Sequence, residues 1–430
     1  MMLKNILGTS GARILNALAS LLILWIATNQ LGREAWGTAG LILLDISLIL
    51  LIVELFAGSA LVYFTPRKSA RNLLLIAYIW TAIVLVFFSL AFGLLSLFPQ
   101  VYELVVPKGY GIHILLLVAL NSLHGVNLNL LLGKKRISAY NKLFVTQFCV
   151  LLVTFSIMVW ALEIKDERAF VYALYVSYGL PVLFGWLLVL PYITSVHNSK
   201  GQISLRELFT YGLIGQLASI THLINKRLSY YFIRIYAGLS PLGVYAAGIQ
   251  LTEGLRLIGQ SISLVQFSSI SNSNDPGYAR LISLQLLKFS VVLTSMALVV
   301  LISIPRHVFE LVFSNAFGDI KLVIISLAPG VIALSANTIF SHYFSGTGRP
   351  KYNLYAALIG LIVTIPALFI LIPAYGFIGA GISASLAYAA AVVYQWFVFR
   401  HLTGSRATEL LPSISDFKLM ANAFKALFKS

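Results

Sequence analysis

Several ionisable side chains lie inside segments of the sequence that are otherwise apolar. An ionisable group costs free energy in the hydrocarbon of a bilayer, so each one is a candidate for binding a substrate or an ion. Six are basic and three are acidic. The basic residues are Arg13, Lys226, Arg227, Arg234, Arg256 and Lys288, and the acidic residues are Asp45, Glu54 and Glu253.

The surplus of basic side chains favours an anionic substrate, such as a phosphate or pyrophosphate group. A guanidinium can donate two parallel hydrogen bonds to phosphate oxygens. Arg227 and Arg234 are seven residues apart and share a helix face, with Lys226 beside Arg227. The residues expected to bind substrate are therefore Arg13, Lys226, Arg227, Arg234 and Arg256.

The acidic residues Asp45, Glu54 and Glu253 are candidates for ion coupling, with a proton or sodium, or for charge balance. Asp45 and Glu54 are nine residues apart, about 180° around an ideal helix, so they are not expected to share one site. Structural alternatives remain open. Glu253 and Arg256 can form an ion pair on one helix face, whereas Arg13, Arg234 and Lys288 can extend to the membrane interface.

The sequence gives no signal for an enzyme. The single cysteine, Cys149, lies in an apolar run, and no Cys/His cluster has metal-ligand spacing. His113 and His124 are eleven residues apart and are expected to be packing or interfacial residues. The segment 346-GTGRPK-351 lacks the Gly-Lys-Ser/Thr ending of a nucleotide-binding P-loop. We expect no metal, no cofactor, no nucleic acid and no catalytic residue.

The elements that carry these residues are predicted to be transmembrane helices. The 430-residue chain is 59% hydrophobic and only 10% charged, against roughly 25% charged in soluble domains. Apolar runs long enough to cross a hydrocarbon core of about 30 Å recur along the chain. They predict spans at about 10–30, 38–63, 73–98, 111–132, 143–162, 169–192, 207–234, 243–268, 281–304, 320–344, 352–372 and 376–399.

Loop charges predict the orientation of these spans. With the N-terminus in the cytoplasm, the cytoplasmic segments hold 18 Lys and Arg residues and the opposite loops hold 6. That is a clear positive-inside bias, so both ends are expected in the cytoplasm. The tail 413-SISDFKLMANAFKALFKS-430 reads as a basic amphipathic helix that lies on the inner leaflet, or docks on cytoplasmic loops.

A weak internal repeat divides the chain. Gly32 and Gly37 follow the first span, and Gly238 and Gly243 follow the seventh at an offset of 206 residues. Two parallel sets of six helices are expected, related by a pseudo-twofold axis along the membrane normal. The predicted domains are an N-terminal lobe (1–200), a C-terminal lobe (201–402) and a cytoplasmic tail (403–430).

The segments 31-LGREAWGTAG-40, 228-LSYYFIRIYAGLSPLGVYAAGIQLTEGLRLIGQSIS-263 and 346-GTGRPKYN-353 resemble bacterial polysaccharide or oligosaccharide flippases, the Wzx-like proteins. These belong to the multidrug/oligosaccharidyl-lipid/polysaccharide exporter superfamily. Many relatives have Asp at the position of Ser229, so this departure bears on ion coupling.

The resemblance implies the all-α, MATE-like fold and a task. It implies movement of an undecaprenyl-pyrophosphate-linked oligosaccharide repeat unit from the cytoplasmic to the periplasmic leaflet of a bacterial inner membrane, in O-antigen or capsule biosynthesis. It also implies a basic central cavity, rocking lobes that alternate access, and a polysaccharide polymerase and a chain-length regulator as partners.

Other functions remain open on the sequence alone. An ion-coupled multidrug or metabolite antiporter of the same fold would need an acidic cation site at Asp45 or Glu253. A peptidoglycan-lipid flippase usually has two more helices than the twelve predicted here. A membrane-bound polymerase or transferase typically has a large periplasmic loop, whereas the outer loop near 305–319 is short.

Overall fold

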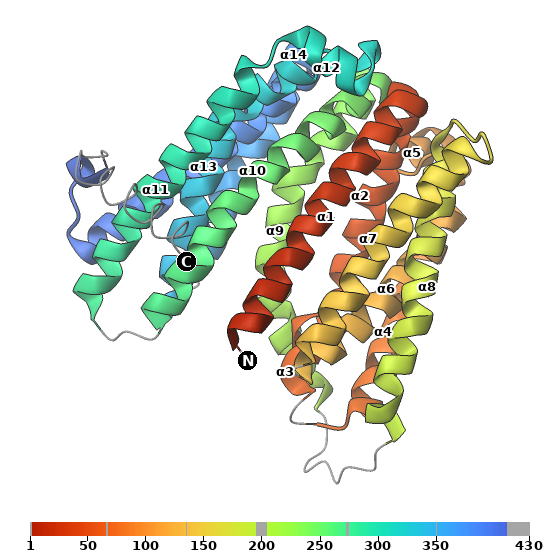
Figure 1. The fold of residues 1–430 in the computed structure, drawn as a ribbon, viewed down its shortest axis with the longest axis horizontal. Helices are drawn as coiled ribbons and strands as arrows, with labels where there is room; N and C mark the ends of the chain where they lie inside the picture. The colour runs from red at the N-terminus through yellow and green to blue at the C-terminus, as the bar shows by residue number, and fades with distance from the viewer. Residues whose placement is uncertain are drawn as a thin grey trace. The chain divides into compact units, whose positions relative to one another are not determined.

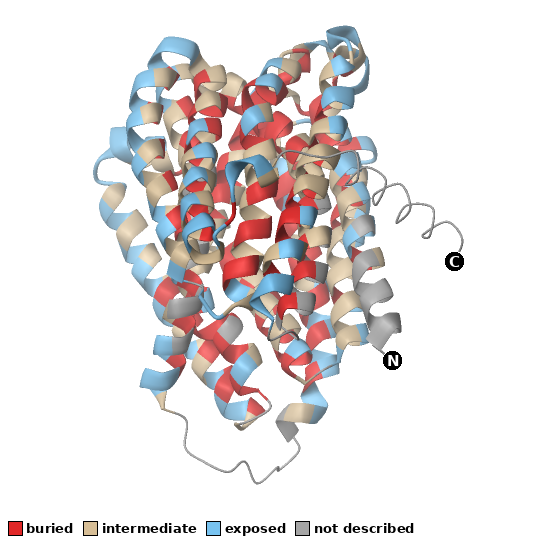
Figure 2. Ribbon diagram, turned by 90° about the vertical axis from the view of Figure 1, so that its left-hand side faces the viewer, coloured by how far each residue is buried: buried red, intermediate tan, exposed pale blue. Residues whose placement is uncertain are grey.

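The protein is entirely helical in the part that the computed structural model describes, which is residues 2–65, 68–134, 136–194, 204–271, 275–349 and 351–410 (Figure 1). The predicted tail helix at 413–430 lies outside these residues. The described helices combine buried and exposed residues (Figure 2), and many of the exposed side chains are large and apolar. This pattern suits helices that pack on one face and meet lipid on the other.

The first six predicted spans are helices, although three of them begin six to eight residues before the predicted start, at Met2, Gly32 and Ile137. Two short helices, α3 and α5, accompany them. The elements are α1 (Met2–Gln30), α2 (Gly32–Ala57), α3 (Ser59–Phe64), α4 (Ala70–Leu95), α5 (Pro99–Val105), α6 (Gly111–Gly133), α7 (Ile137–Trp160) and α8 (Glu167–Thr194).

The remaining spans also follow the prediction, and three further short elements lie between or after them. The elements are α9 (Leu205–Ala237), α10 (Leu239–Ser271), α11 (Pro276–Ser303), α12 (Arg306–Phe313), η1 (Asn315–Phe317), α13 (Ile320–Gly346), α14 (Lys351–Thr403) and η2 (Ala407–Leu410).

Among the described residues, nine helices are long and apolar enough to cross a membrane, so the protein is a multi-pass membrane protein. Helix α14 is one of them and contains two of the predicted spans. Its 53 residues would extend about 80 Å if straight, and Gly376 breaks it with a φ of +56°. Helices α9 and α10, with 33 residues each, contain charged residues and lie outside this group of nine.

The second predicted span, 38–63, contains a break that the sequence analysis did not predict. Helix α2 ends at Ala57, and α3 starts again after Gly58. A Cβ atom on Gly58 would lie only 2.6 Å from the Glu54 carbonyl oxygen and 3.1 Å from Gln216 Nε2. Close approach of a neighbouring side chain therefore accompanies the break.

The chain forms two compact units. Unit 1 comprises Met1–Leu223, Gly238–Ala246 and Val312–Ala316, and unit 2 comprises Ile224–Ala237, Ala247–Leu311 and Phe317–Ser430. In unit 1, α6 packs against α2, α3, α4, α7 and α8. In unit 2, α11, α13 and α14 enclose an apolar cluster rich in aromatic rings, which includes Phe340, Tyr343, Phe344 and Phe399.

Candidate functional site

The first turns of α2 and α10 cross at two glycines, within unit 1. Gly37 lies against the carbonyl oxygen of Leu239, and Gly243 lies against the carbonyl oxygen of Arg33. A Cβ atom on either glycine would overlap that oxygen. Glycine at both positions allows the two backbones to approach closely, as small residues do at helix crossings in membranes.

The internal repeat relates the two glycine contacts of this crossing to each other. The offset of 206 residues relates Gly37 to Gly243 and Arg33 to Leu239. If each residue is exchanged for its equivalent in the other half, the contact of Gly37 with Leu239 is converted into the contact of Gly243 with Arg33. A twofold axis produces such paired contacts. The weak sequence repeat thus corresponds to a structural one.

The opposite end of α2 contacts the first half of α9, also within unit 1. Gly212 lies against the carbonyl oxygen of Leu55, where a Cβ atom would overlap. One turn further along α9, the Gln216 amide donates a hydrogen bond of 3.0 Å to Glu54 Oε2. Helix α2 is therefore held near both ends by segments from the second half of the chain.

Asp45 lies between these two contacts. It is eight residues from Gly37 and nine from Glu54, which is about 12 Å and 14 Å along the helix. The side chain is 4% exposed, whereas that of Glu54 is exposed and bonded to Gln216. The two carboxylates have different surroundings, as their spacing predicts. Burial raises the pKa of Tyr102, in α5, and the Asp45 carboxylate adds to this increase.

Four of the five predicted substrate-binding residues are on α9 and α10 and belong to unit 2, and the side chains of two of them are described. Arg256 lies near the middle of α10 and is half-buried, with Glu253 one turn away on the same helix and also half-buried. Arg234 lies in the last turn of α9 and is half-buried as well. The charges thus lie on the predicted helices.

The other predicted residues are less informative. Arg13 lies on α1 and is exposed, and Lys288 lies on α11 and is half-buried. The side chains of Lys226 and Arg227 lie outside the described residues. His113, predicted to be a packing or interfacial residue, has Nδ1 2.9 Å from the Tyr175 hydroxyl.

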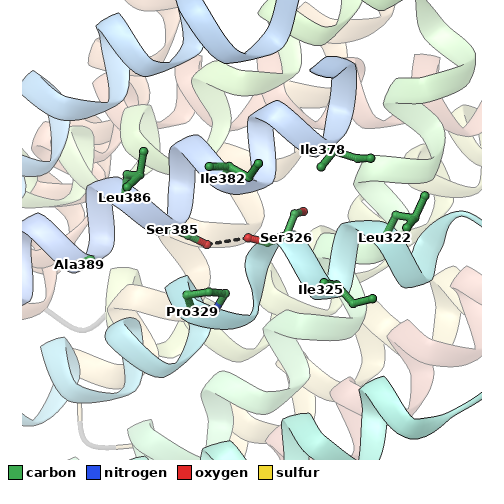
Figure 3. Close-up of a pocket in the computed structure, with 9 residues that line it drawn as sticks. All are labelled: Leu322, Ile325, Ser326, Pro329, Ile378, Ile382, Ser385, Leu386 and Ala389. Atoms are coloured by element: carbon green, nitrogen blue, oxygen red, sulfur yellow. Dashed lines mark hydrogen bonds between the residues drawn. The ribbon is translucent and has the colours of Figure 1, made fainter. Parts of the chain in front are cut away.

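A side chain enters the backbone ladder of α13, within unit 2. The Ser385 hydroxyl of α14 accepts a hydrogen bond from the Gly330 backbone N–H (3.1 Å) and donates one to the Ser326 carbonyl oxygen (2.8 Å). It therefore bridges a donor and an acceptor four residues apart, which an uninterrupted helix would join directly. This bridge lies beside Pro329, which has no N–H to donate to the preceding turn of the helix (Figure 3).

Hydroxyl groups also join other helices of unit 2. Ser335 Oγ of α13 lies 2.6 Å from Ser290 Oγ and accepts a hydrogen bond of 3.0 Å from Thr294, both in α11. Gln266 of α10 donates to Ser283 of α11 at 2.9 Å. Such bonds stabilise helix association where water does not compete.

Ion pairs lie beyond the ends of the spans. Arg280, at the start of α11, binds both carboxylate oxygens of Glu409 in η2 at 2.7 Å and the Ser405 hydroxyl at 2.9 Å. The Arg280 guanidinium holds the pKa of Glu409 below its usual value. Asp166 is paired with Arg168 at 2.6 Å, and the hydrogen bonds from Arg168 hold the pKa of Asp166 low.

Gln216 and Ser385 were missed by the sequence analysis, which considered charge and not uncharged polar groups. Signals for both exist in the sequence. Gln216 follows Gly212 by one helical turn, and Pro329-Gly330 marks a weakened helix that needs an external partner. The identity of that partner depends on how α13 and α14 pack.

The helices and their order match those of solved structures with the MATE-like fold. An inward-facing multidrug resistance MATE family transporter of the MOP superfamily matches with a TM-score of 0.69 and 16% identity, over 91% of this chain and 96% of the other. The lipid II flippase MurJ, in an inward closed conformation, matches with a TM-score of 0.69 and 16% identity, over 99% of this chain and 92% of the other.

A relative by sequence is an uncharacterized membrane protein of Methanocaldococcus jannaschii. It is 23% identical over 225 residues, which are 50% of this chain and 44% of the relative, so the match spans less than half of that protein. No protein-family model matches the sequence.

Proposed function

We propose that this protein is a flippase that moves undecaprenyl-pyrophosphate-linked oligosaccharide repeat units between the leaflets of a bacterial inner membrane. The observation that carries the proposal is the position of Arg256. It lies about 25 Å from the start of α10 and about 22 Å from its end, at 1.5 Å per residue. Arg256 is half-buried there, and an ionisable side chain near the middle of a membrane helix is by default a candidate for binding.

The chemistry of arginine suits the pyrophosphate of the proposed substrate. Substrate sites of membrane transporters commonly lie near the middle of the bilayer. A guanidinium there meets phosphate oxygens with two parallel hydrogen bonds, in a medium that screens the charge little. Arg13, Arg234, Lys226 and Arg227 would add positive charge along the path. Glu253, one turn from Arg256, would balance the charge when no substrate is bound.

The shared fold with a lipid II flippase supports a lipid-linked substrate, because the same arrangement of helices already serves a substrate of that kind in MurJ. The contacts of α2 support alternating access. One end of α2 is held by α10 at Gly37, and the other by α9 at Gly212 and Gln216. Release of one contact while the other persists would expose one side of the membrane at a time.

The orientation, lobes, tail and partners in this proposal are those expected from the sequence. The termini lie in the cytoplasm, the lobes divide at about 200, and the tail after 402 lies on the inner leaflet. A polymerase and a chain-length regulator would act on the product after it reaches the periplasmic leaflet. The surplus of basic loop residues supports this orientation.

Reconstitution tests the proposal. Proteoliposomes containing a fluorescent undecaprenyl-pyrophosphate-linked sugar would be assayed for protection of the sugar from an external quencher. We expect Arg256→Gln to slow movement by about tenfold to a hundredfold, the loss of one charged hydrogen-bonded contact. Arg256→Lys should recover only part of the rate, because the ammonium cannot bind in a bidentate way.

Lys288→Gln is the matched control, since Lys288 is also half-buried in a spanning helix but is not assigned to binding. Equal rates for wild type and Arg256→Gln would refute the role of Arg256. Absence of movement by the wild-type protein, with lipid and protein both intact, would refute the function.

The burial of Asp45 favours one second candidate, a cation-coupled antiporter. A carboxylate that is 4% exposed in a membrane helix is a possible proton or sodium site. Drug efflux that is abolished by Asp45→Asn but unaffected by Arg256→Gln would establish this function in place of the flippase.

A further inference from the structure

An apolar groove lies between α13 and the second part of α14, entirely within unit 2 (Figure 3). Its volume is about 450 Å³, in the range of about 300–1,000 Å³ that is common for ligand sites. The residues that line it are Leu322, Ile325, Ser326, Pro329, Ile378, Ile382, Ser385, Leu386 and Ala389.

The two hydroxyl groups in this lining already donate their hydrogen bonds inside the protein. Ser326 donates to the Val323 carbonyl oxygen at 2.9 Å, and Ser385 bridges Gly330 and Ser326. No hydroxyl proton of the lining remains for a ligand, and the other seven residues are hydrocarbon. The groove therefore suits a hydrocarbon chain.

The length of the groove matches one leaflet of a bilayer. From Leu322 to Pro329 is about 10 Å along α13, and from Ile378 to Ala389 is about 16 Å along α14. Half of a hydrocarbon core of about 30 Å is about 15 Å. The side is also open, since Leu322, Ile325 and Leu386 are 42%, 44% and 48% exposed. A chain from the surrounding bilayer can enter sideways.

A positive charge lies at the end of the groove where α13 begins. Lys321 is in the first turn of α13, four residues before Ile325, so both lie on one face of the helix. Lys321 is therefore at the end of α13 where the headgroup of a lipid would lie if the lipid's acyl chain ran past Ile325 toward Ala389. A lysine ammonium group attracts an anionic headgroup by its charge.

We propose that this groove binds one acyl chain of an anionic phospholipid, with the lipid phosphate at Lys321. The depth of one leaflet fits a phospholipid acyl chain, whereas the polyprenyl tail of a lipid-linked sugar is several times longer. The bound chain packs against Pro329, so the lipid covers the turn of α13 in which the proline N–H is missing. The site does not depend on the transport function proposed above.

Native mass spectrometry of the full-length protein in detergent tests the site. The probes are phosphatidylglycerol, phosphatidylcholine with the same acyl chains, and undecaprenyl phosphate. We expect saturable binding of one phosphatidylglycerol by the wild-type protein. Ala389→Trp fills the groove and should weaken this binding about tenfold. Lys321→Gln should weaken it about fivefold and leave phosphatidylcholine unaffected.

Val393→Trp is the matched control. Val393 lies one turn beyond Ala389 on α14, is 53% exposed and does not line the groove, so phosphatidylglycerol binding should be unchanged. A series of phosphatidylglycerols with six to sixteen carbons in each chain, applied to the wild-type protein, needs no variant to fold. Affinity should rise with chain length until the groove is filled.

Two results would overturn the proposal. Equal binding by Ala389→Trp and Val393→Trp, or affinity that does not change with chain length, would show that the groove holds no acyl chain. If Ala389→Trp selectively lost the binding of undecaprenyl phosphate, the groove would instead bind the tail of a polyprenyl lipid.

Discussion

Gly37 and Gly243 hold equivalent places on either side of one helix crossing, each against a carbonyl oxygen from the other's helix. These two contacts join α2 to α10 near the start of each helix. Both have the same arrangement, a glycine against a carbonyl oxygen. Neither glycine has a positive φ, so what each position requires is space and not an unusual backbone conformation.

Substitution of either glycine by alanine should destabilise the protein, because the new methyl group would overlap backbone, which cannot rotate away. We expect a loss of about 1–3 kcal/mol in the free energy of unfolding for Gly37→Ala and for Gly243→Ala. Unfolding in detergent, followed by circular dichroism, measures the loss.

Gly254→Ala is the control for this prediction, since it lies on α10 with no atom within 4 Å of the position of a Cβ. It should be neutral or slightly stabilising, because alanine favours the helix. If Gly37→Ala behaved like Gly254→Ala, the close crossing would be disproved.

Ser385→Ala should weaken the contact between α14 and α13 at Gly330. The substitution leaves the Gly330 N–H and the Ser326 carbonyl without their bridge, where water is scarce. A loss of about 1–2 kcal/mol in unfolding free energy is expected, with faster hydrogen exchange at Gly330. Ser383→Ala is the matched control, because Ser383 is buried two residues away and donates only to Gly379 of its own helix. An unchanged exchange rate at Gly330 in Ser385→Ala would count against the bridge.

The contact of Arg280 with Glu409 should depend on pH. The pKa of Glu409 is lowered in the folded protein, so the stabilisation is complete above the usual pKa of about 4.5 and is lost as the pH falls through the lower folded value. Hydrogen exchange of 404–410 should therefore accelerate on acidification below pH 4.5. Glu409→Gln should show the fast exchange already at pH 7. Slow exchange of Glu409→Gln at pH 7 would show that the ion pair does not hold this segment.

Glu54 and Gln216 should be energetically coupled. Their hydrogen bond of 3.0 Å joins α2 to α9, so removal of either partner loses the same bond. A double-mutant cycle with Glu54→Ala and Gln216→Ala should give a coupling free energy of about 1 kcal/mol. The pair Asp45→Ala and Gln216→Ala is the comparison. Coupling of similar size in both cycles would mean that the effect is not specific to the hydrogen bond.

The spans were predictable because hydrophobic length leaves few alternatives in a membrane. The sequence also predicted 352–372 and 376–399 as separate spans. In the structure both lie in α14, which is interrupted at Gly376. The repeat was readable from four glycines. The break at Gly58 was not, since it coincides with the approach of Gln216, which is 162 residues from its hydrogen-bond partner Glu54.

The candidate site was only partly predictable. Charge singles out Arg256 and Asp45, because a charge in a membrane has few explanations. Neutral polar groups such as Ser385 give no such signal, since a serine can satisfy itself by bonding to its own helix, as Ser383 does. Which serine reaches across to a neighbour is decided by packing.

The bridge at Ser385 has a consequence for the synthesis of the protein. Gly330 and Ser385 are 55 residues apart, so α13 leaves the ribosome before its partner hydroxyl exists. At about 5–20 residues per second, this interval lasts about 3–11 s. During that time the Gly330 N–H and the Ser326 carbonyl oxygen have only their own helix, or water, as partners. Insertion of α14 is therefore the step that adds the hydroxyl contact between the two helices.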